Sequence, residues 1–135
     1  MYQVNVYNVS TEGNTRIAKN FKAKEFACKD GNTIVIVSTK LADYLQKARD
    51  HFGKPLIINS GFRTVSHNKA VRGVSNSQHL YGVAADCYMN GVAPETLYNF
   101  FCEICPDSCG VGLYDWGVHF DVRPIKARWD SRTKK

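Results

Sequence analysis

The clearest periodic pattern in the chain lies between Thr39 and Phe52. Apolar residues recur there every three or four positions, as on one face of a helix, and charged residues fill the other face. These apolar residues are Leu41, Tyr44, Leu45, Ala48 and Phe52. Ser38 is suited to cap this helix, and Gly53-Lys54-Pro55 ends it. A second helix is predicted from Ala93-Pro94-Glu95, because proline in the first turn lacks only an N–H that the helix does not use.

Short apolar runs elsewhere in the chain are typical of strands. They span residues 33–37, 56–60, 83–89, 109–114 and 118–123. Asp115-Trp116-Gly117 has the composition of a tight turn, so the last two runs are expected to pair. Together these elements predict an α+β fold. We expect a small antiparallel sheet with two main helices on one face and a cleft on the other.

The first nineteen residues are predicted to form an extension at an edge of the fold. Residues 2–9 alternate partly as a strand does, residues 10–14 favour a turn, and residues 15–18 are expected to return as a hairpin. With 135 residues, 44% of them hydrophobic, the chain is long enough for one domain with a core. We expect a main domain over residues 20–129 and a basic tail over residues 130–135.

Composition limits the cellular setting and the partners. No apolar run reaches the ~20 residues that cross a bilayer, and the N-terminus lacks the basic start and apolar stretch of a signal peptide. We therefore expect synthesis in the cytoplasm without export by a signal peptide, and no transmembrane segment. The net charge of +6 favours anionic partners. Part of it lies near the C-terminus, where we expect a solvated end and no dedicated nucleic-acid site, since no nucleic-acid-binding motif accompanies the charge. These residues are Lys126, Arg128, Arg132, Lys134 and Lys135.

The five cysteines are an odd number, which excludes complete pairing within one chain. Cys102, Cys105 and Cys109 have a spacing that suits a metal, but no fourth cysteine or histidine lies near them in the sequence. We expect free or occasionally paired thiols near a helix end, in a reducing compartment.

His79 and Asp86 are candidates for a metal site. They are seven positions apart, which would separate them by ~10 Å along a helix and place them on opposite faces of a strand. The chain must therefore turn back between them, and Gly82 can adopt the conformation that such a turn needs. His119, in another apolar run, would supply a third ligand from a neighbouring strand. Two imidazoles and one carboxylate, with a water in the fourth position, are typical of catalytic zinc.

These residues stand within a longer set of motifs that resembles the zinc D-Ala-D-Ala peptidase family, closest to its short single-domain members from bacteria and phages. The resemblance runs from about Asn20 to Trp129. It implies a fold like that of DD-peptidases and hedgehog domains, and Zn²⁺ held by His79, Asp86 and His119. The matching motifs are Ser60-Gly61-Phe62-Arg63, Asn68, Ser77-x-His79-x2-Gly82-x-Ala84-x-Asp86, His119-Phe120-Asp121-Val122-Arg123 and Arg128-Trp129.

The resemblance also implies roles for residues around the metal. Arg63 would bind a substrate carboxylate or the charge that develops in the reaction, and Ser77 and Asp121 would contact substrate. The family's general base is an acid commonly three positions before the second histidine, where this chain has Trp116. Asp115, one position earlier, is therefore predicted to be the base, and Asp121 is the alternative.

The function implied is hydrolysis of peptidoglycan stem or cross-link peptides at the cell wall, by a protein expected to be monomeric. Carboxypeptidase and endolysin-like endopeptidase activities both remain open. Trp116, in place of an acid, favours one alternative, a catalytically inactive zinc-containing module that binds the cell wall. A nucleic-acid-binding domain fits the charge but not the motifs.

Overall fold

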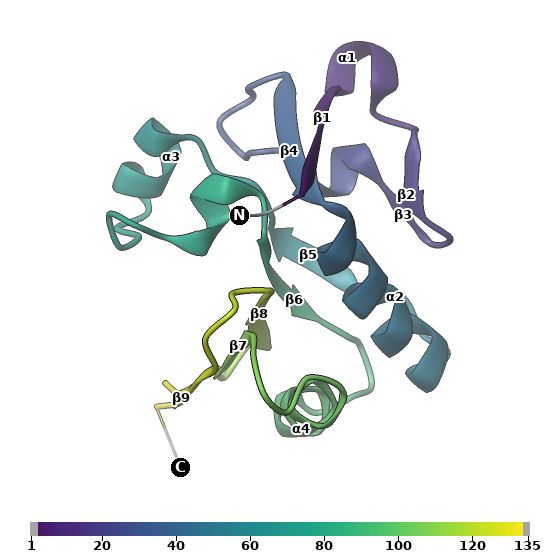
Figure 1. Cartoon of the computed structure of the whole chain (residues 1–135), viewed down its shortest axis with the longest axis vertical. Helices are drawn as coiled ribbons and strands as arrows, with labels where there is room; N and C mark the ends of the chain where they lie inside the picture. Colours follow the sequence, from purple (N-terminus) through teal and green to yellow (C-terminus); the bar gives the residue numbers. More distant parts are fainter. Residues whose placement is uncertain (1–2, 134–135) are drawn as a thin grey trace.

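The computed structural model describes residues 3–133, in which a five-stranded sheet forms the centre (Figure 1). The strand order is β5-β6-β8-β7-β9, and all neighbours are antiparallel except β7 and β9, which are parallel. The strands are β5 (Ile57–Ser60), β6 (Ala84–Tyr88), β7 (Gly110–Leu113), β8 (Val118–Asp121) and β9 (Ala127–Asp130). The predicted α+β class is confirmed, with one parallel pair that was not expected.

Two helices cover one face of this sheet, as predicted. Helix α2 (Thr39–Phe52) begins where Ser38 Oγ accepts a hydrogen bond from Leu41 N, and it ends at Gly53 in the left-handed conformation. Helix α4 (Pro94–Ile104) has proline in its first turn. Both helices contact Phe120 of β8: the ring of Phe101 stacks on it at 4.5 Å, and the ring of Tyr44 meets it edge-on at 5.5 Å. Since neighbouring residues of a strand point to opposite faces, His119 and Asp121 lie on the face away from the helices.

The predicted N-terminal hairpin is wrong in its pairing. Strand β1 (Val4–Asn8) pairs with β4 (Ile34–Ser38), and β2 (Arg16–Ala18) pairs with β3 (Phe21–Lys22). Between β1 and β2 the chain forms a short helix, α1 (Val9–Glu12), where Asn8 Oδ1 accepts from Ser10 N, and this turn directs β2 away from β1. Phe21 is then buried against Phe26 of the 3-10 helix η1 (Ala23–Phe26).

The segment before His79 has short helices, although the sequence pattern predicts no helix there. It contains helix α3 (Val65–Ala70), which Thr64 caps by accepting from His67 N, and the 3-10 helix η2 (Gln78–Tyr81). Both helices are too short to leave a periodic pattern in the sequence. Within residues 3–133 no helix combines the length and apolar character needed to cross a membrane.

The expected solvated C-terminal end is also partly wrong. Arg128 lies on β9, where it donates to the carbonyl oxygens of Cys105 and Cys109, and Arg132 forms an ion pair with Asp130. Backbone pairing with β7 and these carbonyl acceptors hold the segment in place. Lys126 is exposed as expected, and Lys134 and Lys135 lie outside the described residues.

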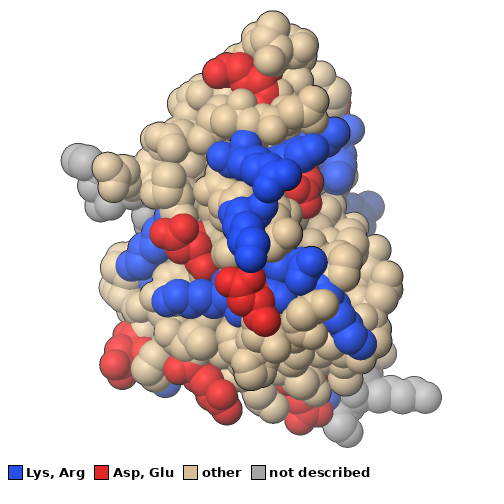
Figure 2. Space-filling model, turned by 90° about the vertical axis from the view of Figure 1, so that its right-hand side faces the viewer, with Lys and Arg blue, Asp and Glu red and all other residues tan. Residues whose placement is uncertain are grey.

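Positive charge also gathers far from the C-terminus. Figure 2 shows Lys and Arg side chains clustered on the face that Figure 1 presents on its right, where β2, β3 and α2 lie. Arg16, Lys19 and Lys22 line a shallow pocket there. The affinity for anionic partners that the net charge favours stays a prediction.

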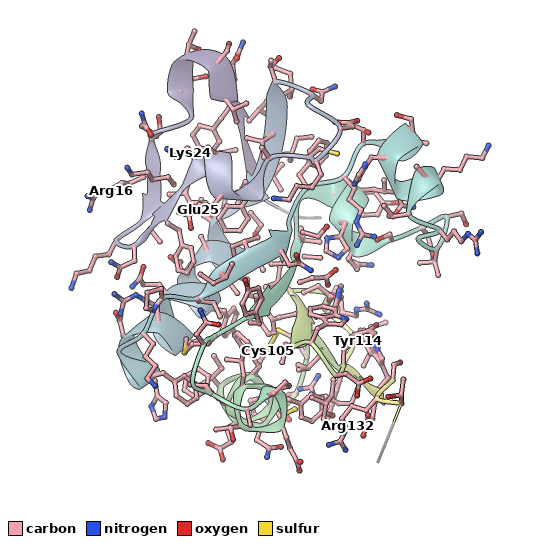
Figure 3. The ribbon with its side chains drawn as sticks, turned by 180° about the vertical axis from the view of Figure 1, so that it is seen from behind. Arg16, Lys24, Glu25, Cys105, Tyr114 and Arg132 are labelled. Atoms are coloured by element: carbon pink, nitrogen blue, oxygen red, sulfur yellow. A yellow bond between two sulfur atoms is a disulfide. The ribbon has the colours of Figure 1, made fainter. Side chains whose placement is uncertain are left out.

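Cys105 and Cys109 form a disulfide, a pair near a helix end of the kind that the sequence left open. Cys105 follows the end of α4 (Figure 3), and the turn after the helix brings the two Cα atoms to 6.4 Å, within the range that a disulfide spans. The unpaired cysteines among the described residues are Cys28, Cys87 and Cys102.

Gly82 closes the turn that the metal site needs, and it leads to a stability prediction. Its φ is +72°, and a Cβ there would overlap the carbonyl group of Ile36. Gly53 has φ +67° with nothing within 4 Å of an added Cβ, so it serves as a matched control. Gly53→Ala is expected to cost about 1–2 kcal/mol for the left-handed conformation. Gly82→Ala should cost about 1–3 kcal/mol more for the overlap.

Urea denaturation of the two glycine variants measures this difference in the free energy of unfolding. Equal losses in Gly82→Ala and Gly53→Ala would show that the contact with Ile36 does not constrain the turn.

Candidate metal centre

His79 is buried and held from two sides. It lies in η2, where Ser77 Oγ accepts from its backbone N–H at 3.2 Å and Gly82 ends the helix. Its ring Nδ1 is 2.6 Å from the carbonyl oxygen of Gly61. A carbonyl can only accept, so Nδ1 carries the hydrogen. The lone pair of Nε2 therefore faces Asp86 Oδ1, at 3.2 Å.

His119 reaches the same oxygen from the neighbouring strand. Asp86 on β6 and His119 on β8 are direct partners in the antiparallel register. His119 Nε2 lies 2.7 Å from Asp121 Oδ2, which as a carboxylate acts as the acceptor, so the hydrogen is on Nε2. Its Nδ1 lies 2.9 Å from Asp86 Oδ1. Two imidazole nitrogens thus converge on one carboxylate oxygen.

This arrangement suits a cation. Ring nitrogens with lone pairs repel a carboxylate oxygen unless a positive charge lies between them. Without such a cation, the imidazoles can bond to Asp86 only when they are protonated on the facing nitrogens as well. Burial would then raise the pKa of Asp86, but hydrogen bonds from the protonated His119 and His79 rings outweigh burial and hold that pKa well below its ordinary range. Burial would lower the pKa of His119, yet Asp121 and Asp86 raise it. One ligand atom from each of His79, Asp86 and His119 lies within 4.8 Å of the other two, so the residues fit a metal.

Arg63 is placed by three side-chain contacts. It follows β5, and its Nε, Nη1 and Nη2 donate to Ser60 Oγ at 3.1 Å, Asn68 Oδ1 at 3.2 Å and Asp86 Oδ2 at 3.1 Å. The guanidinium thus holds the carboxylate oxygen that the histidines do not approach. Asn68, which accepts the bond from Arg63 Nη1, lies on helix α3. This helix, which was not expected, therefore helps to position Arg63.

Asp121 lies behind His119. It is fully buried, and it accepts hydrogen bonds from Gly110 N, from the backbone and guanidinium of Arg123, and from His119. Burial alone would raise its pKa, but the bonds from His119 and Arg123 outweigh burial and lower it. A carboxylate that fixes the tautomer and direction of a metal-binding imidazole is a recurring part of metal sites.

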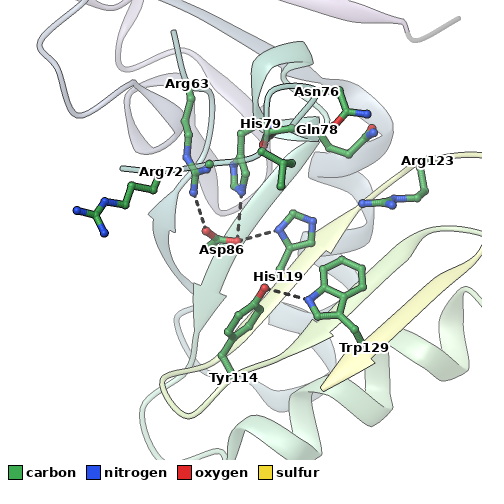
Figure 4. A pocket seen from close by; sticks show the side chains of 13 residues that line it. Arg63, Arg72, Asn76, Gln78, His79, Asp86, Tyr114, His119, Arg123 and Trp129 are labelled. Carbon is green, nitrogen blue, oxygen red and sulfur yellow. Dashed lines mark hydrogen bonds and ion pairs between the residues drawn. The ribbon is translucent and has the colours of Figure 1, made fainter. Parts of the chain in front are cut away.

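The cluster opens into a cavity of about 480 Å³ (Figure 4). It brings together the predicted residues Arg63, Ser77, His79, Asp86 and His119. The full lining is Arg63, Arg72, Gly73, Val74, Asn76, Ser77, Gln78, His79, Asp86, Tyr114, His119, Arg123 and Trp129. Asp121, which the resemblance places in contact with substrate, is fully buried and lies outside this lining.

The structure does not bring Asp115 to the cavity. Asp115 is exposed, and its carboxylate accepts from the backbone N–H and the hydroxyl of Thr133. The turn after β7 points this side chain towards the C-terminal segment. Its role as general base stays a prediction, and it requires the carboxylate to leave Thr133.

Sequence reasoning missed Tyr114 as a site residue. The signal was present in the alternation along β7, where Gly110 and Gly112 share a face with Tyr114, the next residue after the strand. In the register, Gly110 and Gly112 lie opposite Asp121 and His119. The two glycines have no side chains, so the side chains of Asp121 and Trp129 can lie against this face of β7. A face kept open in this way is a signal that it belongs to the site.

Two imidazoles and one carboxylate beside an open cavity form a group that could hold a metal, with the donor set that metallohydrolases use. Residues 19–121 match the family model described as peptidase M15, and since the match covers most of the chain, the chain belongs to this family. The family consists of zinc-dependent metallopeptidases, so the resemblance that the motifs carry is confirmed. No curated protein was found to match the chain.

Proposed function

We propose that the chain is a zinc peptidase that hydrolyses stem or cross-link peptides of peptidoglycan at the cell wall. The convergence of His79 Nε2 and His119 Nδ1 on Asp86 Oδ1, on the floor of an open cavity, carries this proposal. It supports three protein ligands with space beside them for water and substrate.

In this proposal His79, Asp86 and His119 hold the zinc. When bound, zinc polarises the scissile carbonyl and lowers the pKa of a water molecule. The second nitrogen of each histidine stays bonded to Gly61 or Asp121, which keeps both rings aimed at the site. Arg63, Arg72 and Arg123 line the cavity and give it a positive wall, which suits the terminal carboxylate of a stem peptide.

A second candidate function is a zinc-containing module that binds cell-wall peptides without cleaving them. One observation favours it. Among the cavity-lining residues Asp86 is the sole carboxylate, and Trp116 stands where the family commonly has its acid. Under this alternative the purified protein would hold zinc and bind peptidoglycan but release no peptide.

Digestion of purified peptidoglycan decides between these functions. We expect the parent protein to release peptides or D-alanine, to lose this activity with a chelator, and to regain it with added zinc. Free D-alanine would indicate a carboxypeptidase, and loss of cross-linked dimers an endopeptidase. A zinc-loaded protein that releases neither product would favour the binding module.

Arg63→Lys tests the guanidinium. Lysine keeps the charge but cannot contact Ser60, Asn68 and Asp86 with three nitrogens in one plane. We expect activity to fall about 10- to 100-fold, as for other residues that support metal ligands, while zinc stays bound because all three ligands remain. Kinetics and elemental analysis measure the two effects.

The matched control is Arg16→Lys, at an exposed position on β2 far from the cavity, which should leave both readouts unchanged. Full activity in Arg63→Lys would mean that only a positive charge is needed at this position.

A further inference from the structure

Tyr114 presents a hydroxyl group to the cavity that no role described above uses. It follows β7, is half-buried and lines the cavity. Figure 4 shows the hydroxyl end of the ring directed towards His119 and Trp129, across the cluster from Arg63. The phenol and the guanidinium thus stand on opposite sides of the three candidate ligands.

The hydrogen of this hydroxyl is available for a ligand. Trp129 Nε1 lies 2.9 Å from Tyr114 Oη. An indole N–H can only donate, so the phenol oxygen is the acceptor in this bond. Among the described residues no acceptor is bonded to the Tyr114 hydroxyl, which leaves its O–H to be donated into the cavity.

Several contacts fix the position of the phenol. Trp116 stacks on its ring with centroids 5.0 Å apart, so the residue that replaces the family's acid supports Tyr114. The Trp129 ring in turn lies 5.2 Å from the His119 ring and 5.5 Å from the Arg123 guanidinium. A Cβ at Gly112 would overlap the Trp129 indole, so this glycine makes the arrangement possible. A donor held in this way loses little freedom when it binds.

We propose that Tyr114 is a catalytic residue whose O–H donates a hydrogen bond to the oxyanion that develops on the scissile carbonyl oxygen. This rests on the proposed peptidase function. As the oxygen of water bonds to the carbonyl carbon, the C=O π electrons move to the carbonyl oxygen, which accepts the bond from Tyr114. When C=O forms again, the C–N bond breaks and the amine nitrogen takes a proton that came from the water. Tyr114 keeps its proton throughout, and one water is consumed for each peptide bond.

Tyr114→Phe tests this role because it keeps the ring and removes only the hydroxyl. We expect kcat to fall about 100-fold, the size of effect seen when one oxyanion donor is removed, with KM nearly unchanged. Zinc content should stay the same. Affinity for a phosphinate dipeptide analogue, which mimics the tetrahedral state, should fall by a similar factor, while affinity for the D-Ala-D-Ala dipeptide should hardly change.

Tyr88→Phe is the matched control, since Tyr88 is half-buried on β6 but does not line the cavity. Trp129→Phe removes the indole donor and should give a smaller loss, about 10-fold, because the hydroxyl remains but is less well held. Unchanged kcat and analogue affinity in Tyr114→Phe would overturn the inference, as would loss of zinc or equal loss of dipeptide and analogue binding. A parent protein that cleaves no peptide would overturn the proposed function itself, and the inference with it.

Discussion

His79→Ala, Asp86→Ala and His119→Ala are each expected to lose stoichiometric zinc, and peptide release with it. Each replacement leaves two protein ligands, fewer than the three of catalytic zinc sites. The structure adds a reason, because among the described residues no fourth His, Cys, Asp or Glu side chain is grouped with these three to replace a missing ligand. Elemental analysis after dialysis and a peptide-release assay measure the two losses.

The control for the ligand variants is His67→Ala, since His67 lies on α3 and does not line the cavity. It should keep zinc and activity. Full zinc and activity in any of the three ligand variants would remove that residue from the ligand set.

Asp121→Asn and Asp115→Asn are expected to behave in opposite ways, although both aspartates flank His119 in the sequence. The Asp121→Asn change would leave the guanidinium of Arg123 without its buried carboxylate and would weaken the bond that orients His119. Breaking a buried pair costs about 3–5 kcal/mol, and the lower end applies because the Arg123 side chain is 29% exposed. Zinc affinity should fall about 10- to 100-fold. Asp115→Asn should change neither stability nor zinc affinity, because Asp115 is exposed.

The loss of stability in Asp121→Asn, relative to Asp115→Asn, should depend on pH. The pKa of Asp121 is lowered in the folded protein, so its stabilising contribution is complete above the ordinary pKa of ~3.9 and is lost as the pH falls below that value. Urea denaturation of both variants at neutral and acid pH measures their free energies of unfolding, and the difference between the variants should be smaller at acid pH. Loss of peptide release in an Asp115→Asn variant that is stable and binds zinc normally would support the prediction that Asp115 is the general base, which requires its carboxylate to leave Thr133.

Two features that depend on local sequence were predicted correctly. The helix from Thr39 to Phe52 was predictable because its period, its cap at Ser38 and its end at Gly53 all agree. A shared site for His79 and Asp86 requires the chain to turn back between them, and the turn predicted at Gly82 is confirmed by its positive φ. These inferences needed only geometry over a few neighbouring residues.

Features that depend on distant partners could not be predicted in this way. Strand β1 pairs with β4 and β9 with β7, and neither partner is adjacent along the chain. The direction of Asp115 depends on Thr133, eighteen positions away. The role proposed for Tyr114 depends on its contact with Trp129. Because the indole N–H donates to the phenol oxygen, the phenol hydrogen is left for a ligand in the cavity.

Crystallography of the purified protein with anomalous scattering recorded at the zinc edge tests the central claim most directly. We expect one anomalous peak in the cavity, bonded to His79 Nε2, His119 Nδ1 and an oxygen of Asp86, with Asp121 still bonded to His119 Nε2. A zinc-supplemented protein with no peak between these three residues, or with zinc bound through His119 Nε2, would contradict the account.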